Sequence, residues 1–191
     1  TKEWVGTPQP GLKVGLFKKA DLSGAAAASP TTSAVKAIPG TANKETIKFE
    51  DINLTDDLGQ DIEYVARELD ANNNIIKEEA FELGNRKYKV SYEDKDRVIT
   101  NTELIDITVK KEWDNNVPES ERQSVDVQLY DADGNVKDTA MLTEAGSWEH
   151  IFKDLHYLDT GYSVKEININ GRPVEELGKL FKITIDGEDK S

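Results

Sequence analysis

The sequence contains no cysteine, and this absence removes several kinds of chemistry. Without thiols the chain can form neither a disulfide staple nor a thiolate metal site, and it has no cysteine nucleophile. Its two histidines, His150 and His156, supply too few ligands for a structural zinc site. We therefore expect no metal and no cofactor.

Basic residues are also fewer than acidic residues. The chain has 24 Lys and Arg residues against 37 Asp and Glu residues, for a formal net charge of −13. This balance argues against nucleic acid and against an anionic membrane surface as partners. No apolar run approaches the length of a transmembrane helix, and no signal peptide is recognisable, so we expect no membrane insertion. Because the chain begins inside a predicted strand, we expect it to be a segment of a longer protein.

The chain does contain the same short motif twice, as Lys2-Glu3-Trp4 and as Lys111-Glu112-Trp113. Before the second copy, Ile107 and Val109 alternate with polar residues, so a strand would place Lys111 on their apolar face. A lysine is almost never fully buried without a partner. Either this lysine snorkels at the end of a sheet, or the register slips there, or the amine has a special task.

Short segments of alternating polarity, separated by turn signals such as Asn72-Asn73-Asn74, predict an all-β chain without a convincing helix. The main predicted strands are 1–4, 12–17, 46–49, 61–69, 88–92, 97–101, 125–130, 147–152, 162–167 and 182–185.

The order of these segments is repeated along the chain. Residues 14–17 correspond to residues 127–130, and Phe49 to Ile52 correspond to Phe152 to Leu155. Tyr64 to Glu68 correspond in the same way to Tyr162 to Glu166. The repeat predicts two tandem immunoglobulin-like β-sandwich domains, residues 1–102 and 104–191. An Ala-, Ser-, Thr- and Pro-rich stretch near residues 21–44 is long for a connection inside a domain, so we interpret it as an insertion.

Residues 131–135 read Asp-Ala-Asp-Gly-Asn, which is similar to the start of a calcium loop. The distal glutamate that such a loop needs is not in place. A hairpin turn accounts for the same residues, and we predict no metal site there.

Taken together, the motifs of the second copy resemble a Cna B-type domain, the repeat that forms stalks in collagen-binding adhesin and in many Gram-positive surface proteins and pilins. The resemblance covers residues 107 to about 167. It rests on Lys-x-Trp, Val-Gln-Leu-Tyr at 127–130, Leu-Thr-Glu-Ala-Gly-Ser-Trp at 142–148, Phe-Lys-Asp-Leu at 152–155 and Tyr-Ser-Val-Lys-Glu at 162–166. The first copy is more divergent, but residues 98–102, Val-Ile-Thr-Asn-Thr, resemble the closing strand of the family.

This resemblance implies a spontaneous isopeptide bond between a lysine of the first strand and an asparagine of the last, assisted by a buried acid. Carried over by motif, the first domain offers Lys2, Asn101 and Glu68 as amine, electrophile and proton shuttle. The second domain offers Lys111 and Glu166. Such a domain reacts once within itself and is not a turnover enzyme.

The second copy departs from this pattern because it has no counterpart of Val-Ile-Thr-Asn before the chain ends at Ser191. We therefore expect the second domain to lack its last strand and Lys111 to be unlinked, unless Asp186 or Asp189 takes the role of the asparagine. A missing strand would leave an edge near Lys111 open to a complementing strand from another chain.

The leading functional hypothesis is a structural stalk segment of an extracellular, cell wall-anchored adhesin or pilus protein, whose partners are its neighbouring domains. The alternative is a binding module for a host extracellular-matrix protein or glycan. A glycosidase ranks lowest, because it needs paired carboxylates in a cleft and the acidic residues here are scattered over turns.

Overall fold

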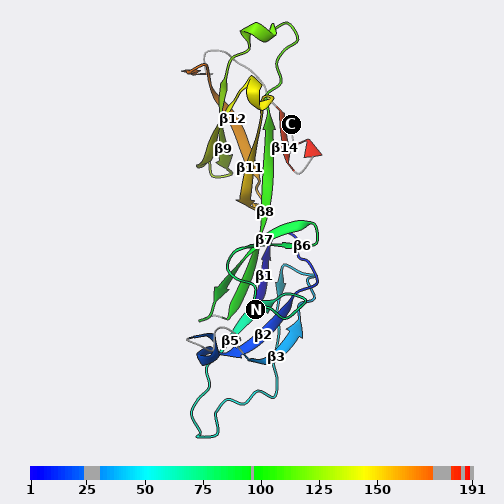
Figure 1. The fold of residues 1–191 in the computed structure, drawn as a ribbon, viewed down its shortest axis with the longest axis vertical. Helices are drawn as coiled ribbons and strands as arrows, with labels where there is room; N and C mark the ends of the chain where they lie inside the picture. Colours follow the sequence, from blue (N-terminus) through cyan, green and yellow to red (C-terminus); the bar gives the residue numbers. More distant parts are fainter. Residues whose placement is uncertain (24–30, 96, 174–181, 186–187, 190–191) are drawn as a thin grey trace. The chain divides into compact units, whose positions relative to one another are not determined.

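In the computed structural model, the described residues are 1–23, 31–95, 97–173, 182–185 and 188–189, with only the backbone described from 182 onward. They contain short 3-10 turns and no α-helix. The chain divides into two compact units, Thr1–Leu104 and Ile105–Ser191. Each unit is built from strands in an immunoglobulin-like arrangement, which confirms the predicted all-β class (Figure 1).

The first unit has two facing sheets. One has the strand order β6-β7-β8-β1-β4 and the other β3-β2-β5. Strand β8 continues beyond the first unit to Lys110. The strand bounds are β1 Lys2–Val5, β2 Lys13–Lys18, β3 Thr32–Ala37, β4 Lys44–Glu45, β5 Tyr64–Leu69, β6 Ala80–Leu83, β7 Arg86–Glu93 and β8 Val98–Lys110, with a 3-10 turn η1 at Lys19–Leu22.

The second unit also has two sheets. One has the order β10-β9-β12-β13, and in the other the end of β8 is paired with β11 and with β14, which in turn pairs with β15. The bounds are β9 Val125–Asp131, β10 Val136–Leu142, β11 Glu149–His156, β12 Tyr162–Ile169, β13 Arg172–Pro173, β14 Lys182–Ile185 and β15 Glu188–Asp189, with 3-10 turns η3 at Glu119–Glu121 and η4 at Glu144–Gly146.

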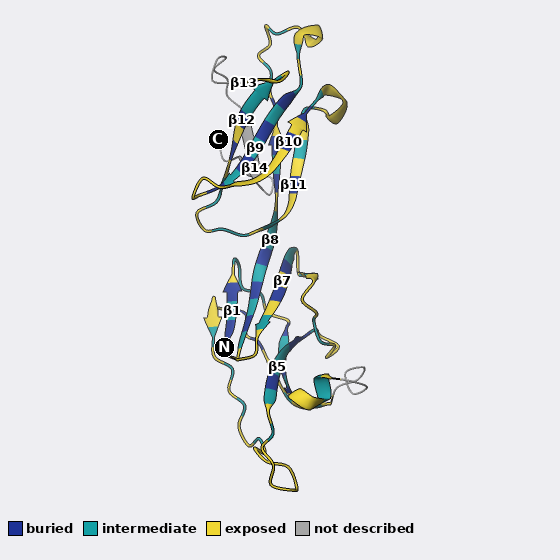
Figure 2. Ribbon diagram, turned by 90° about the vertical axis from the view of Figure 1, so that its left-hand side faces the viewer, coloured by how far each residue is buried: buried dark blue, intermediate teal, exposed yellow. Residues whose placement is uncertain are grey.

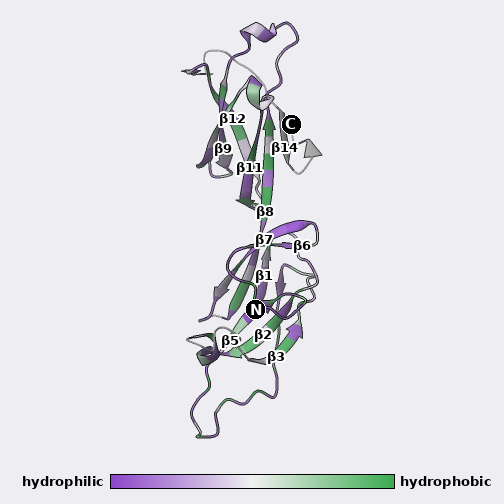
Figure 3. Ribbon diagram, in the orientation of Figure 1, coloured by the Kyte–Doolittle hydropathy of each residue, from purple (hydrophilic) through white to green (hydrophobic). Residues whose placement is uncertain are grey.

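Alternation along the strands explains where each core lies. In β8, Ile107 and Val109 are buried while the residues between them are not, and the same face continues to the buried Lys111 (Figure 2). This register confirms that Lys111 shares the apolar face. Figure 3 shows hydrophobic stretches on strands such as β2 and β8. Trp4, Val14, Tyr88 and Val90 belong to the core of the first unit, whereas Val127, Leu129 and Phe152 belong to that of the second.

The predicted strand at residues 46–49 is wrong. Strand β4 ends at Glu45, and the following residues form no strand, with Asp51 adopting a φ of 57°. A positive φ at an aspartate belongs to a turn, so the extended run is broken there. The corresponding Phe152 lies within β11, which continues to His156.

The hairpin at residues 131–135 uses the carboxylate of Asp131 internally. Its oxygens accept hydrogen bonds from the backbone and side chain of Asn135 and form an ion pair with Lys137 at 2.8 Å. Among the described residues, no group of His, Asp or Glu has the arrangement of a metal site. No helix in the described part of the chain has the length and apolarity needed to span a membrane.

Candidate functional site

Three strands of the first unit bring the predicted side chains together. Strand β1 carries Lys2 and pairs in parallel with β8, which sets Trp4 opposite Asn101. Strand β5 of the facing sheet carries Glu68. Lys2 is 1% exposed and the other two are fully buried. Residues distant in sequence therefore form one dry, polar cluster inside the sandwich.

Glu68 connects the lysine to the asparagine. Its Oε1 lies 3.5 Å from Lys2 Nζ and accepts a hydrogen bond of 3.2 Å from Asn101 Nδ2. Lys2 Nζ also donates to the carbonyl of Glu3 at 2.9 Å. Glu68 Oε2 and Asn101 Oδ1 are buried without a hydrogen-bond partner among the described residues. Buried polar atoms normally find partners, so these two oxygens are available to accept a proton or a new hydrogen bond within the cluster.

Burial changes the proton affinities of both ionisable groups. Desolvation lowers the pKa of Lys2 from 10.5 to about 8, against the opposing pull of the Glu68 carboxylate. Desolvation also raises the pKa of Glu68 above 4.5, more than the nearby Lys2 lowers it. Both shifts favour the uncharged forms, a free amine beside a carboxylic acid.

Aromatic rings close the cluster. The Trp4 ring lies 4.3 Å from Lys2 Nζ and packs edge-on against Tyr88. A ring face tolerates a nearby ammonium and also excludes water, so it can accompany the amine in either protonation state. This contact explains why the lysine and the tryptophan recur two residues apart.

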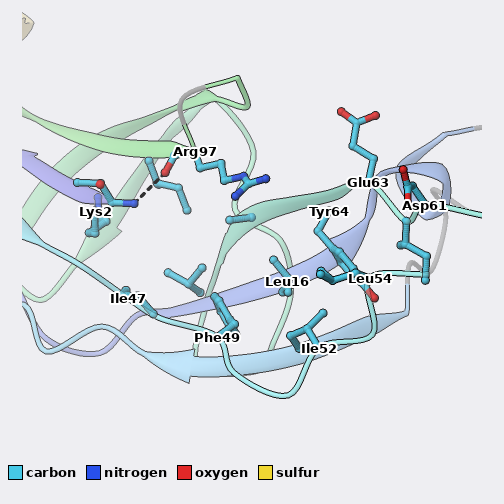
Figure 4. A pocket seen from close by; sticks show the side chains of 15 residues that line it. Lys2, Leu16, Ile47, Phe49, Ile52, Leu54, Asp61, Glu63, Tyr64 and Arg97 are labelled. Carbon is cyan, nitrogen blue, oxygen red and sulfur yellow. Dashed lines mark hydrogen bonds between the residues drawn. The ribbon is translucent and has the colours of Figure 1, made fainter. Parts of the chain in front are cut away.

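A cavity of about 740 Å³ lies beside the cluster in the first unit. Figure 4 shows Lys2 at one end and apolar side chains along the cavity. They include Leu16, Ile47, Phe49, Ile52 and Leu54, with Asp61, Glu63 and Arg97 also in the lining. The irregular segment after β4 forms one wall, so the cavity exists where the predicted strand at 46–49 is absent.

The second unit repeats the lysine and the glutamate of this cluster. Lys111 Nζ donates to Glu166 Oε2 at 3.2 Å, and the two side chains are 2% and 1% exposed. The amine lies 4.9 Å from the ring of Trp113, which packs edge-on against Trp148. Glu166 Oε1 has no hydrogen-bond partner within the described ranges. The structure therefore places the predicted lysine and the predicted acid of the second domain in direct contact.

The structure brings no described asparagine or aspartate side chain to Lys111 as a hydrogen-bond partner. Asp186 lies outside the described residues. The backbone of Asp189 pairs with Thr184, but its side chain is not described. The expected open edge is wrong at residues 107–110, because β14 pairs there antiparallel with β8, from Lys182 opposite Lys110 to Ile185 opposite Ile107.

Sequence reasoning missed Tyr92 and Glu103. The Tyr92 hydroxyl accepts the backbone N–H of Glu68 and donates to the carbonyl of Ile76 at 2.6 Å. Glu103 is 2% exposed, pairs with Arg86 and accepts the backbone N–H of Thr7. Glu103 follows Asn101 by two residues and therefore lies on the same face of the strand, which is a sequence signal that Glu103 is buried. Nothing in the sequence near Tyr92 indicates that its hydroxyl contacts the backbone of Glu68 and of Ile76.

A family model described as the Cna protein B-type domain matches residues 107–184. Two solved structures, the B1B2 pair of repeat units and the single B1 unit of the collagen binding protein (CNA) of Staphylococcus aureus, each align with 87% of this chain at 22% identity and a TM-score of 0.33. The chain covers 41% of the two-unit structure and 82% of the single-unit structure. No curated protein matches the chain.

Proposed function

Residues 107–184 are a Cna protein B-type domain, and from this premise we propose that the chain is a stalk segment of a Gram-positive surface adhesin or pilus protein. Its first unit is a second, divergent domain of the same kind, closed by an amide bond between Lys2 and Asn101. The buried contact of Glu68 with both of these side chains carries the proposal. From the same domain assignment we infer the cellular location: outside the cell, with the full-length protein anchored to the cell wall.

The reaction begins with a proton shift inside the cluster. A charged ammonium is not a nucleophile, but burial favours a neutral amine on Lys2 and a protonated carboxyl on Glu68. Rotating the Asn101 carboxamide by half a turn places Oδ1 where Nδ2 now donates. The Glu68 carboxyl can then donate to Oδ1 and polarise the carbonyl carbon.

The amine of Lys2 then attacks the side-chain carbonyl carbon of Asn101. Glu68 takes the proton that the amine loses and returns it to the departing nitrogen, so the C–N bond to that nitrogen breaks and ammonia leaves. The product is a neutral amide between the Lys2 nitrogen and the Asn101 carbon. Holding both partners on paired strands replaces a slow encounter between separate molecules.

The bond would join the first and last strands of the unit. Closing a loop of about 100 residues removes roughly 4–5 kcal/mol of conformational freedom from the unfolded chain, by analogy with a disulfide. A pulling force applied to these strands would pass through the amide without separating the sheets. This property suits a stalk in a chain that contains no cysteine.

Intact mass spectrometry of the purified, denatured chain tests the proposal. We expect a mass lower than the sequence mass by one ammonia, and a crosslinked peptide containing Lys2 and Asn101 after digestion. The same measurement on Lys2→Met should give the full sequence mass of that variant. An unchanged wild-type mass would contradict the bond.

The apolar cavity favours a second candidate, a binding module for a host matrix protein or glycan, since ligand sites are commonly concave and apolar. Solid-phase binding to matrix components should then fall when Ile47→Trp fills the cavity, or when residues 24–30 of the predicted insertion are removed. Binding unaffected by both changes leaves the stalk as the function.

A further inference from the structure

The apolar cavity of the first unit borders a second, more polar hollow. The cavity has a volume of about 740 Å³ and the hollow about 320 Å³, and Ile52, Ile62 and Tyr64 line both. The larger volume alone is typical of ligand sites in proteins. Of the residues that line the two spaces, only Lys2 takes part in the proposed crosslink. The rest of this lining is therefore available for another role.

The loop beside the cavity exposes apolar side chains to solvent. Leu54 and Leu58 are 72% and 83% exposed, more than any other large apolar side chain that the structure describes. Leu54 also lines the cavity, at the end away from Lys2 (Figure 4). Single exposed leucines are common, but two in a loop that borders an apolar cavity extend its apolar surface outward. This surface suits a ligand that has apolar side chains of its own.

The same loop gives the cavity an acidic rim. Four carboxylates in the lining of the two spaces form no ion pair within the described ranges, namely those of Asp51, Asp56, Asp57 and Asp61. On the same criterion, Lys18 and Arg97 are the two cationic side chains of the lining without an ion pair. Glu63 is neutralised by Lys19 at 2.7 Å, and Lys2 belongs to the reactive cluster. Four acids against two bases favour a cationic ligand.

Strand β5, which lines the cavity through Tyr64 and Ala66, lies at the edge of its sheet. The sheet order β3-β2-β5 leaves its outer side without a neighbouring strand. On that side the carbonyl of Glu68 accepts the N–H of Ile76, and the N–H of Glu68 donates to the hydroxyl of Tyr92. Backbone groups two and four residues earlier point the same way, so the N–H groups of Ala66 and Tyr64 face outward and can pair with an added strand.

An extended peptide matches these three features together. Its successive side chains point to opposite faces, so alternating apolar and basic residues direct the apolar side chains to the cavity and leave the cations near the acidic rim. Its backbone supplies carbonyl groups to the open edge of β5, in the manner of strand addition. A glycan has neither alternating side chains nor a peptide backbone for that edge.

We propose that the first unit binds an extended cationic peptide segment of another protein. The segment adds to the edge of β5 at residues 64–66, buries apolar side chains in the cavity and places lysine or arginine side chains near Asp57 and Asp61. The inference rests on the second candidate function, a binding module, and names the class of ligand for its cavity. It does not depend on the bond between Lys2 and Asn101.

The probe is a short synthetic peptide of alternating lysine and leucine, acetylated at its N-terminus and labelled with a dye at its C-terminus. Fluorescence anisotropy follows its titration with the purified full chain. We expect saturable binding that weakens as the salt concentration rises. Two matched peptides, one with glutamate in place of lysine and one with serine in place of leucine, should each bind about tenfold more weakly or less.

Charge variants test the acidic rim. The double variant Asp57→Asn with Asp61→Asn should weaken binding roughly fivefold, because each surface ion pair contributes modestly to the affinity. The matched control is Asp138→Asn with Asp159→Asn, which makes the same change of charge at exposed positions of the second unit. The control should bind the peptide as the wild type does.

Two further variants test the cavity and the strand edge. Ile47→Trp fills the cavity and should weaken binding about tenfold or more, because an apolar anchor of the peptide loses its place. Ala66→Pro removes an outward N–H group from an edge strand, where proline is tolerated, and should weaken binding as well. Circular dichroism verifies that each variant is folded.

Three results would overturn the inference. The first is a folded wild-type chain that does not bind the lysine–leucine peptide, including a chain that binds a neutral oligosaccharide instead. The second is equally tight binding of the glutamate–leucine or the lysine–serine peptide. The third is an affinity that is unchanged both in Ile47→Trp and in the Asp57 and Asp61 double variant. The intact mass of the same chain reports separately on the Lys2–Asn101 bond, so failure of the proposed stalk function is recognised independently.

Discussion

Trp4 lies opposite Asn101 across a parallel pair of strands, and this register sets the geometry of the first cluster. It places Lys2 two residues before the tryptophan, on the same buried face, while Glu68 reaches both side chains from the facing sheet. The Lys2-Glu3-Trp4 spacing thus places the Lys2 amine on the buried face, beside the ring of Trp4.

Glu68→Gln should block bond formation, because the amide cannot exchange protons as a carboxyl does at this position. We expect the purified variant to retain its full sequence mass. Glu63→Gln is the matched control, since this nearby glutamate is 69% exposed in its ion pair with Lys19. The control should lose one ammonia as the wild type does; a crosslinked Glu68→Gln chain would contradict the shuttle role.

Asn101→Ala should leave the chain unlinked and lower the free energy of unfolding of the first unit by about 4–5 kcal/mol, from loop closure alone. Urea unfolding followed by tryptophan fluorescence measures the loss. Asn101→Asp separates linkage from side-chain removal, because the acid can still react with Lys2 and release water. That variant should be lighter than its sequence by one water and should recover most of the stability.

Strand alternation predicted the all-β class and placed Lys111 on the apolar face of its strand, because alternation is a local signal. The grouping of each lysine with its glutamate was implied only by the resemblance to the Cna B-type domain. Sequence reasoning failed at residues 46–49, where the alternation looks extended but Asp51 turns the backbone. It also failed at the edge beside Lys111, because β14 pairs with β8 there. Pairing between strands distant in sequence depends on which neighbours are present, and local pattern does not encode that.

The stability of the unlinked Asn101→Ala chain should rise with pH between about 8 and 10.5. Burial lowers the pKa of Lys2 to about 8 from 10.5, so in this window the unfolded chain binds more protons than the folded one. Below this window Lys2 is charged in both states and the burial penalty is fully present. Adding Lys2→Met should remove this rise, which amounts to about 2–3 kcal/mol.

Glu68 changes the pH dependence of folding stability in the opposite direction, and it does so at lower pH. Its pKa is raised by burial, so the folded chain binds the extra proton, and stability falls as pH increases from 4.5 through the raised value. Urea titrations at a series of pH values distinguish the two slopes. A flat profile above pH 8 in Asn101→Ala would show that Lys2 is not desolvated.

Tyr92→Phe should slow bond formation without preventing it. The lost hydroxyl accepts the Glu68 N–H and donates to Ile76, so it fixes the strand that carries the shuttle. We expect a stability loss of about 1–2 kcal/mol and a slower mass change after rapid refolding. Tyr64→Phe is the control, because its hydroxyl donates to the carbonyl of Asn53 in an exposed position. Equal rates in both variants would exclude a positioning role for Tyr92.

Phe152→Ala should destabilise the second unit and leave the first bond intact. Phe152 is 1% exposed in the core with Val127 and Leu129, and truncation of a buried phenylalanine costs about 3–5 kcal/mol. Because the Lys2 cluster is assembled within the first unit, its chemistry does not require that core. We expect the variant to show the ammonia loss of the wild type, with earlier urea unfolding detected at the tryptophans of the second unit. A full sequence mass would mean that the first unit cannot complete its reaction without a folded second unit.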